Sequence, residues 1–274
     1  MSTVEDDEQD LTRKQRREQA RAKRKELEQA EAASAVRRTR LTQLGIVVAI
    51  VVVIIIAVVI ATGGGAKKGV PKASELPKVS SEVTSLVGGI PQNGNTLGNP
   101  NAPVTLQYFG DLECPICRDF TLGALPSLIQ KYVRGGTLKI EYLSLETATK
   151  EPETFKTQQI AALAAGKQQK MWDYIELFYH EQGEEDSGYV TESYLQKLAQ
   201  QVPGLNLTTW TSARSDAELA NSVTSDGQAA NNAGFTGTPS FLIGKTGGRM
   251  QKLEYSSLTE PASFDSAIES ALKA

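Results

Sequence analysis

The chain of 274 residues contains only two cysteines, Cys114 and Cys117, and two residues separate them. Two thiols at this spacing suit thiol–disulfide exchange, in which a thiolate attacks a disulfide sulfur and a second thiol completes the reaction. An apolar run, residues 104–109, precedes the pair, and a helix-like run, residues 118–132, follows it. The pattern predicts two thiols on the first turn of a helix, directly after a strand.

The N-terminus of a helix lowers the pKa of a thiol placed there, because unpaired N–H groups and the positive end of the helix dipole favour the thiolate. Cys114 has this position, and we expect it to be the exposed nucleophile. Cys117 follows one helical turn later and is expected to be the more buried, resolving thiol. Pro115 suits a first helical turn, where its missing N–H costs nothing, and it stiffens the ring that the two cysteines close.

Besides Pro115, the side chains of Ile116 and Glu113 are expected to tune the pair. Ile116 neither donates a hydrogen bond nor carries a charge, so it does not stabilise a thiolate. Glu113 and Asp111, just upstream, would repel a thiolate if they lay near it. We therefore predict a reduction potential less oxidising than that of the strongest protein oxidants, which equilibration with glutathione would measure.

A zinc site and an inert structural disulfide are less well supported as roles for the pair. A zinc site needs about four ligands, whereas the chain offers two cysteines and one histidine, His180, far away in sequence. A structural disulfide over so short a loop would constrain little of the unfolded chain. We expect no metal and no cofactor. His180 is expected at the surface or boundary of the domain, with Trp172, Phe178 and Tyr179 in the core.

The surrounding elements indicate an α/β fold. Residues 104–109 and 138–145 are predicted strands, and the helix between them, with an expected kink at Pro126, makes a strand–helix–strand unit with two parallel strands. Residues 152–233 are predicted to be entirely helical, as a subdomain inserted into that framework. A strand at 240–243, a hairpin loop at 244–248, a partner strand at 250–255 and a closing helix at 261–273 are then expected.

The N-terminal third has a different composition. Residues 1–43 form a charged arm, and residues 44–61 are 18 residues without a charge, which is about the length of a transmembrane helix. A cleaved signal peptide is the alternative, although its apolar region is usually shorter and nearer the start of the chain. Residues 62–95 are rich in Gly, Lys, Pro and Ser and are predicted to be a linker to a domain at 96–274.

The distribution of charge suggests how the chain is oriented in a membrane and argues against one class of partner. The basic cluster Arg37, Arg38 and Arg40 flanks the apolar run, which favours a cytoplasmic N-terminus, an anchor in the lipid bilayer and an extracytoplasmic main domain. Residues 96–274 hold 14 basic and 21 acidic side chains, a net charge of −7. An acidic domain argues against nucleic acid as its partner.

These residues resemble the DsbA-type thioredoxin-like thiol–disulfide oxidoreductases, in particular their membrane-tethered bacterial members. The resemblance runs from residues 89–92 through the Leu97–Pro103 segment, the Phe109–Cys117 turn and the helical insertion to Gly237-Thr-Pro-Ser-Phe241. It implies a thioredoxin fold with an inserted helical subdomain, preceded here by a single transmembrane helix. A C-x-x-C motif alone is weak evidence, and the Gly-Thr-Pro-x-Phe segment about 120 residues later makes it specific.

The resemblance also implies a cis peptide bond at Thr238-Pro239 beside the cysteines, with the Thr238 backbone pairing with a substrate peptide. The implied partners are reduced, unfolded polypeptides and a membrane protein that reoxidises the dithiol. Two positions depart from some relatives. Tyr108 stands where they carry a buried acid six residues before the first cysteine, and Ile116 stands where they have a histidine.

The expected function is therefore an extracytoplasmic oxidase that donates the Cys114–Cys117 disulfide to folding secreted or membrane proteins. A reductase or isomerase on the same fold is the first alternative. A membrane-tethered peptide-binding or chaperone module, with incidental thiols, is the second.

Overall fold

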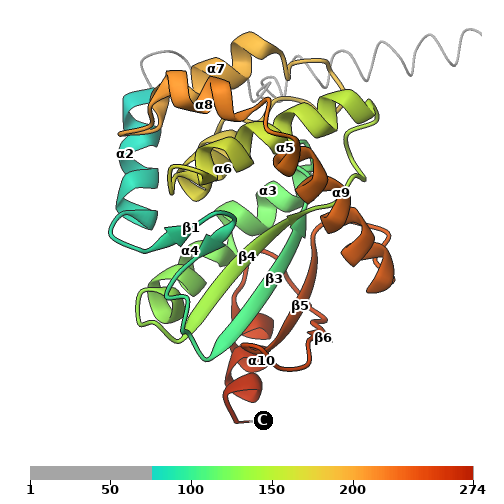
Figure 1. Cartoon of the computed structure of the whole chain (residues 1–274). Helices are drawn as coiled ribbons and strands as arrows, with labels where there is room; N and C mark the ends of the chain where they lie inside the picture. Colours follow the sequence, from blue (N-terminus) through green and yellow to red (C-terminus); the bar gives the residue numbers. More distant parts are fainter. Residues whose placement is uncertain (1–75, 274) are drawn as a thin grey trace, which may run out of the picture. The chain divides into compact units, whose positions relative to one another are not determined.

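The computed structural model describes residues 76–273, with side chains from residue 79, and a six-stranded sheet runs through their centre (Figure 1). The strands are β1 Gln92–Asn93, β2 Thr96–Leu97, β3 Val104–Gly110, β4 Leu138–Ser144, β5 Ser240–Lys245 and β6 Gln251–Lys252. Their order across the sheet is β1-β2-β4-β3-β5-β6. Only β3 and β4 pair in parallel among these described strands, and the other neighbours are antiparallel.

The central strand β3 ends at the cysteine motif. Six of its seven residues are buried, and Gln107 is half-buried. Such a nearly continuous apolar run is typical of a strand that is covered on both faces. Its parallel pairing with β4 and its antiparallel pairing with β5 confirm the predicted strand–helix–strand unit and the predicted C-terminal hairpin.

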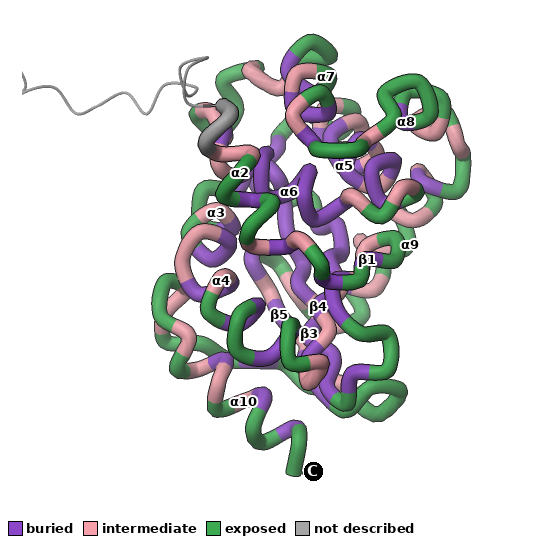
Figure 2. The backbone as a smooth tube through the Cα atoms, turned by 90° about the vertical axis from the view of Figure 1, so that its left-hand side faces the viewer, coloured by how far each residue is buried: buried purple, intermediate pink, exposed green. Residues whose placement is uncertain are grey.

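Helices cover both faces of the sheet and the end where β3 finishes. They are α2 Leu76–Val87, α3 Pro115–Leu122, α4 Ala124–Leu128, the π-helical turn η1 Ile129–Val133, α5 Pro152–Gly166, α6 Met171–His180, α7 Glu192–Gln201, α8 Leu207–Ala213, α9 Ala217–Asn232 and α10 Ala262–Lys273. Figure 2 shows α3 and α4 on one side of the sheet and α9 on the other. The prediction of an all-helical stretch at 152–233 is confirmed by α5 to α9.

One predicted helix is divided at a different place. The sequence predicts a kink at Pro126, but the helix stops at Gly123 and restarts as α4. A Cβ atom on Gly123 would lie 2.7 Å from the Thr259 Cα atom, and the Ala124 N–H donates to the Leu258 carbonyl at 3.1 Å. The C-terminal loop thus takes the place of a helical turn, while Pro126 lies in a first turn that tolerates proline.

The predicted linker at 62–95 is wrong for its described part. Residues 76–87 form α2, whose Val83 and Val87 side chains are each 1% exposed in the core. Arg134 donates to the carbonyls of Ser85, Leu86 and Gly88 at the C-terminal end of α2. The folded domain therefore begins at least 20 residues before the predicted boundary at 96, because a helix with one apolar stripe can dock despite polar neighbours.

The predicted charged arm at 1–43 and membrane span at 44–61 lie outside the described residues. Among residues 76–273, no helix is both long and apolar enough to cross a membrane.

The helix α6 is the centre of the helical insertion. Its first nine residues, Met171–Tyr179, are all buried, and it contacts α2, α3, α5 and α7. Trp172, Phe178 and Tyr179 are fully buried, as predicted, and His180 at its end is half-buried. A helix that is covered on every side is a core element, so the insertion carries its own part of the hydrophobic core.

A carboxyl group lies inside this helical core. Glu176 is 0% exposed, and neither of its carboxylate oxygens has a hydrogen-bond partner among the described residues. Burial, followed by the nearby Asp173 carboxylate, raises the pKa of Glu176 to about 8. The neutral acid is therefore the favoured form at neutral pH, because an unpaired charge is costly to bury.

Replacing Glu176 by Gln should make the stability of the protein less dependent on pH. The folded pKa of about 8 lies above the ordinary value of 4.5. The stability that Glu176 contributes is thus fully present below pH 4.5 and is lost as the pH rises through 8. The loss is at most about 1.4 kcal/mol per pH unit. Denaturant unfolding of both proteins at several pH values in this window measures it, and an identical slope in the two proteins would contradict it.

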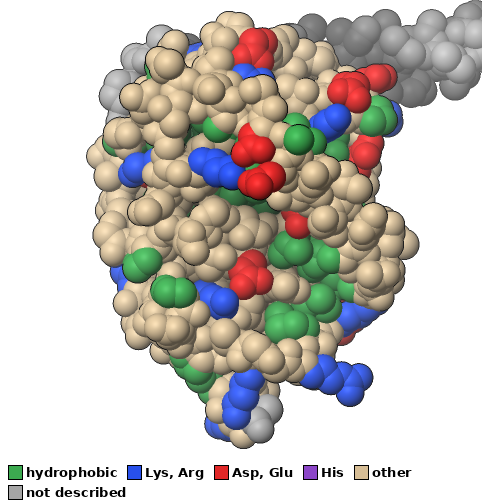
Figure 3. Space-filling view, in the orientation of Figure 1, with side chains coloured by type: hydrophobic (Ala, Val, Ile, Leu, Met, Phe, Trp, Pro, Cys, Tyr) green, Lys and Arg blue, Asp and Glu red, His purple; other side chains and the backbone are tan. Residues whose placement is uncertain are grey.

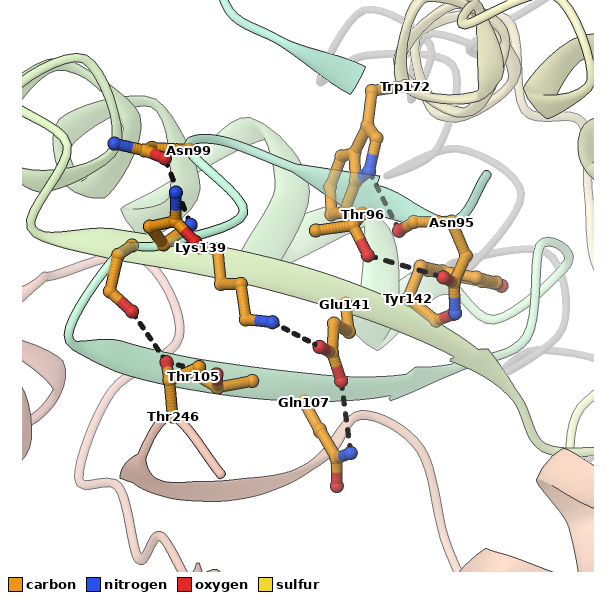
Figure 4. A network of polar contacts seen from close by, with 12 residues as sticks. Asn95, Thr96, Asn99, Thr105, Gln107, Lys139, Glu141, Tyr142, Trp172 and Thr246 are labelled. Carbon is orange, nitrogen blue, oxygen red and sulfur yellow. Dashed lines mark hydrogen bonds and ion pairs between the residues drawn. The ribbon is translucent and has the colours of Figure 1, made fainter. Parts of the chain in front are cut away.

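One face of the sheet carries a polar network that joins β3, β4 and the residue after β5 (Figure 4). Glu141 accepts a hydrogen bond from Gln107 at 3.1 Å and lies 3.1 Å from the Lys139 ammonium. The hydroxyl groups of Thr105 and Thr246 are 2.8 Å apart. These cross-strand contacts satisfy polar side chains of β3 and β4 that are buried or half-buried.

Figure 3 shows hydrophobic side chains gathered where α9 meets β5 and β6, on the side of the molecule that faces the viewer in Figure 1, with basic side chains nearby. Leu242 and Ala229 line a groove there, together with Lys245, Arg249 and Lys252. Neither cysteine contributes to its lining. The candidate chemistry therefore lies elsewhere, at the end of β3.

Candidate active site

The turn between β3 and α3 places Cys114 at the N-cap of the helix. Cys114 has an extended backbone conformation, with φ −69° and ψ 117°, and its sulfur accepts a hydrogen bond from the Cys117 N–H at 3.4 Å. Pro115 follows as the first helical residue. The structure confirms the predicted strand–cysteine–helix arrangement, in which the open N–H groups of the first turn surround the sulfur.

The buried carboxylate of Asp111 organises this turn. One oxygen accepts hydrogen bonds from the N–H groups of Thr147, Ala148 and Thr149, at 2.9 to 3.1 Å. The other accepts from the Glu113 N–H at 3.1 Å and from the Thr149 hydroxyl at 2.6 Å. Asp111 is therefore occupied in holding the loop after β4 against the cysteine turn, and it is not directed at the thiolate.

The segment before β5 lies over Cys114. The Thr238-Pro239 bond is cis, and the Cys114 thiol donates to the Thr238 carbonyl at 3.5 Å. The Thr238 hydroxyl is hydrogen-bonded to that of Thr147, and the Tyr255 hydroxyl donates to the Pro239 carbonyl at 3.2 Å. The structure thus brings together residues 124 positions apart in the sequence, as the resemblance implied.

Both cysteines are free thiols in the structure, and both are more covered than the sequence predicts. Cys114 is 5% exposed and Cys117 is 0% exposed. The expectation of an exposed nucleophile is therefore wrong in degree, because the Thr238 segment covers the sulfur. The predicted order, with Cys117 more deeply buried, is confirmed.

The two thiols differ in acidity. The pKa of Cys114 is lowered to about 7, mainly by a hydrogen bond with the Cys117 side chain. Burial raises this pKa, and further hydrogen bonds with Thr238 and with the backbone of the first helical turn lower it. Burial, followed by the neighbouring Cys114, raises the pKa of Cys117 well above its ordinary value. Near neutral pH the pair therefore offers one thiolate and one thiol, as a nucleophile and a resolving group require.

Alkylation by iodoacetamide should report this difference in acidity. We expect the rate for Cys114 to rise with pH around a midpoint near 7, because only the thiolate reacts. Replacing Cys117 by Ala removes the largest contribution to the lowered pKa and should move the midpoint to higher pH. A midpoint that is unchanged in the variant would contradict the assigned role of the Cys117 thiol.

The remaining residues expected to tune the pair have distinct surroundings. The Ile116 side chain is 46% exposed, and Pro115 is also exposed. Glu113 is 2% exposed. Burial raises the pKa of its carboxyl group, and a hydrogen bond with Thr149 lowers that pKa in part. No group of three or more potential metal ligands exists within the part of the chain that the structure describes.

The helical insertion contributes contacts that the sequence did not predict. The Gln182 side-chain amide donates to the Leu112 carbonyl at 2.8 Å and to the Cys114 carbonyl at 3.1 Å. The Arg118 guanidinium donates to the Tyr179 carbonyl at 2.9 Å. A lone glutamine in a loop carries no sequence signal for such a role, since only the tertiary fold brings it to the turn.

Tyr108, at the position of the acid that some relatives carry, is fully buried beneath α3. Its hydroxyl donates to the Tyr179 hydroxyl at 3.1 Å and lies 3.5 Å from the Cys117 carbonyl. The Tyr179 hydroxyl in turn donates to the Asp111 carbonyl at 3.1 Å. The floor of the site is thus made of neutral hydroxyl groups.

A family model described as thioredoxin matches residues 92–260. The chain belongs to the thioredoxin family. Among curated relatives, a probable disulfide bond formation protein D of Bacillus anthracis is 23% identical over 149 residues, covering 54% of this chain and 68% of the relative. Disulfide bond formation protein D of Bacillus subtilis is 24% identical over 152 residues, covering 54% of this chain and 66% of the relative.

Solved structures share the fold of this thioredoxin-family chain. Oxidised BdbD of Bacillus subtilis has a TM-score of 0.56 at 21% identity and covers 69% of this chain and 99% of its own. DsbA of Chlamydia trachomatis has a TM-score of 0.53 at 15% identity and covers 66% of this chain and 92% of its own. The solved structures show a shared fold, and the family match with the curated relatives supports a DsbA-type thiol–disulfide oxidoreductase.

Proposed function

We propose that this oxidoreductase acts as a dithiol oxidase that passes its Cys114–Cys117 disulfide to folding polypeptides outside the cytoplasm. In the first step a substrate thiolate attacks Cys114 and releases Cys117. A second substrate thiol then attacks the mixed disulfide and leaves with a new disulfide, and the enzyme is left reduced. A membrane redox partner accepts the two electrons and restores the Cys114–Cys117 bond.

The observation that carries this proposal is the stabilised Cys114 thiolate. A pKa of about 7 favours the reduced enzyme over the disulfide, which makes the disulfide an electron acceptor. The shift is moderate, because the largest contribution is a hydrogen bond from Cys117 and the exposed Ile116 side chain adds none. We therefore expect an oxidant of intermediate strength.

The location rests on the N-terminal sequence. The uncharged run at 44–61 and the basic residues before it support a single-pass anchor with the catalytic domain outside. The compartment outside the cytoplasm permits disulfides to persist, which an oxidase needs.

Thiol trapping tests the direction of electron flow. Cells are quenched with acid, free thiols are alkylated with a reagent that adds mass, and the membrane fraction is separated by electrophoresis. A mostly oxidised Cys114–Cys117 pair is the expected result, with a chemically reduced sample marking the position of the reduced form. A mostly reduced pair would overturn the oxidase and favour the reductase.

A further inference from the structure

The C-terminal end of α6 lies against the turn that carries Cys114. The Tyr179 hydroxyl donates to the Asp111 carbonyl at 3.1 Å, at the start of that turn. In the opposite direction, the Arg118 guanidinium of α3 donates to the Tyr179 carbonyl at 2.9 Å. The helical insertion and the cysteine turn therefore hold each other through hydrogen bonds that run both ways.

Gln182, two residues after the end of α6, directs its side-chain amide at two carbonyl groups of the turn. Its nitrogen donates to the Leu112 carbonyl at 2.8 Å and to the Cys114 carbonyl at 3.1 Å. Both neighbours can only accept hydrogen bonds, so the NH2 group and not the side-chain oxygen must face them. An amide NH2 group has two hydrogens, and each carbonyl receives one of them.

The orientation of the Cys114 carbonyl determines how the helix meets the sulfur. Rotation about the Cys114 ψ angle, which is 117°, moves this carbonyl and the following helix relative to the Cys114 side chain. At this angle the carbonyl accepts from the Gln182 amide and from the Arg118 N–H at 3.2 Å. The Cys114 sulfur then accepts from the Cys117 N–H at 3.4 Å. By holding the carbonyl, Gln182 holds the angle that keeps the sulfur at the N-cap.

We propose that Gln182 is a positioning residue for thiol–disulfide exchange, because it keeps the Cys114 backbone in the conformation in which the N–H groups of the first helical turn stabilise the thiolate. These N–H groups favour a negative charge only at short range, so a small rotation of the turn weakens their effect. Gln182 has no charge and does not touch the reacting sulfur. It acts through the backbone, and it makes the helical insertion a working part of the redox site.

The other groups around the turn do not duplicate this contact. The Asp111 carboxylate accepts from N–H groups, including that of Glu113, and a carboxylate cannot hold a carbonyl. The Tyr179 hydroxyl donates to the carbonyl of Asp111, one residue before Leu112. Within the described part of the chain, Gln182 is the only hydrogen-bond donor to the Leu112 carbonyl. Loss of the amide therefore leaves this carbonyl without a replacement from the protein.

Gln182→Met tests the inference, since methionine has a similar length and cannot donate a hydrogen bond. The inference rests on thiol–disulfide exchange and not on its direction. The midpoint of Cys114 alkylation by iodoacetamide should rise from about 7 by about half a pH unit, which is about a threefold loss of thiolate below the midpoint. At about pH 8 the equilibrium constant against glutathione should move about two- to threefold towards the disulfide, because the reduced form loses stabilisation.

Gln168→Met is the matched control. Gln168 is also a half-buried glutamine of the helical insertion, and its side chain makes two hydrogen bonds with the Asn206 backbone, at 3.1 and 2.9 Å. The control should lower the melting temperature about as much as Gln182→Met does, but it should leave the alkylation midpoint unchanged. A merely structural role for Gln182 would give the same pattern as this control.

Thermal unfolding checks that each variant folds. If methionine prevents folding, Gln182→Ala, which truncates the side chain, should raise the midpoint in the same way. A folded Gln182 variant with the midpoint of the unmodified protein would overturn the inference alone. An unmodified protein whose cysteines do not exchange with glutathione would instead overturn the activity on which the inference rests.

Discussion

Replacing Cys114 by Ser is expected to abolish thiol–disulfide exchange, with a fall in rate of more than about a thousandfold. Cys114 is the only described thiol with a lowered pKa, about 7, and a serine hydroxyl cannot form a disulfide. Reduction of insulin disulfides and oxidation of a reduced model protein both measure the activity. The fold should remain intact, since serine also accepts a hydrogen bond from the helix N-terminus.

Cys117→Ser is the informative partner of that variant. It keeps the nucleophile but removes the resolving thiol. We therefore expect a stable mixed disulfide when the Cys114 thiolate attacks a substrate disulfide and releases one of the two substrate sulfurs as a thiolate. That adduct is visible by mass spectrometry and disappears on reduction. If the Cys114→Ser variant kept its activity, the thiols would not be needed for the function, and a peptide-binding module would be favoured.

Replacing Asp111 by Ala should destabilise the domain by about 3–5 kcal/mol. The substitution leaves the N–H groups of Glu113, Thr147, Ala148 and Thr149 without the carboxylate that now accepts from them. For a domain of this size the melting temperature should fall by roughly 10 °C. Because Thr147 contacts Thr238, the segment over Cys114 should also loosen and exchange should slow.

Asp119→Ala provides the control for charge, since Asp119 is an exposed carboxylate on α3 of the same motif. Its effect should stay within about 0.5 kcal/mol. Calorimetry or denaturant unfolding compares the two variants under identical conditions. Similar losses for Asp111→Ala and Asp119→Ala would show that net charge, and not the buried hydrogen bonds, determines the effect.

Local patterns predicted most of the framework correctly. The β-branched and aromatic run before Cys114 became β3, and the apolar run at 138–145 became its parallel neighbour β4. The helical insertion and the C-terminal hairpin also formed where the periodicity and the turn residues indicated. Such signals are encoded within a few residues, so they can be detected without knowledge of the rest of the fold.

The errors occurred where distant segments meet. The helix after Cys117 breaks at Gly123 because the loop at 258–259 occupies the space of its next turn. The segment at 76–87 forms a docked helix, and Arg134, which follows η1, holds its C-terminal end. Neither partner is close in sequence, so local composition had no information about either contact.

By itself the sequence determined the positions of the two thiols, the helix start that lowers the pKa of Cys114 and the proline segment that accompanies them. Only the tertiary structure decided the environment of those thiols. It covers Cys114 with the Thr238 carbonyl, ties its turn to Gln182 and buries Cys117 completely. The physical reason is that bond connectivity fixes the spacing of two neighbours, whereas solvation and hydrogen bonding depend on residues that only folding brings near.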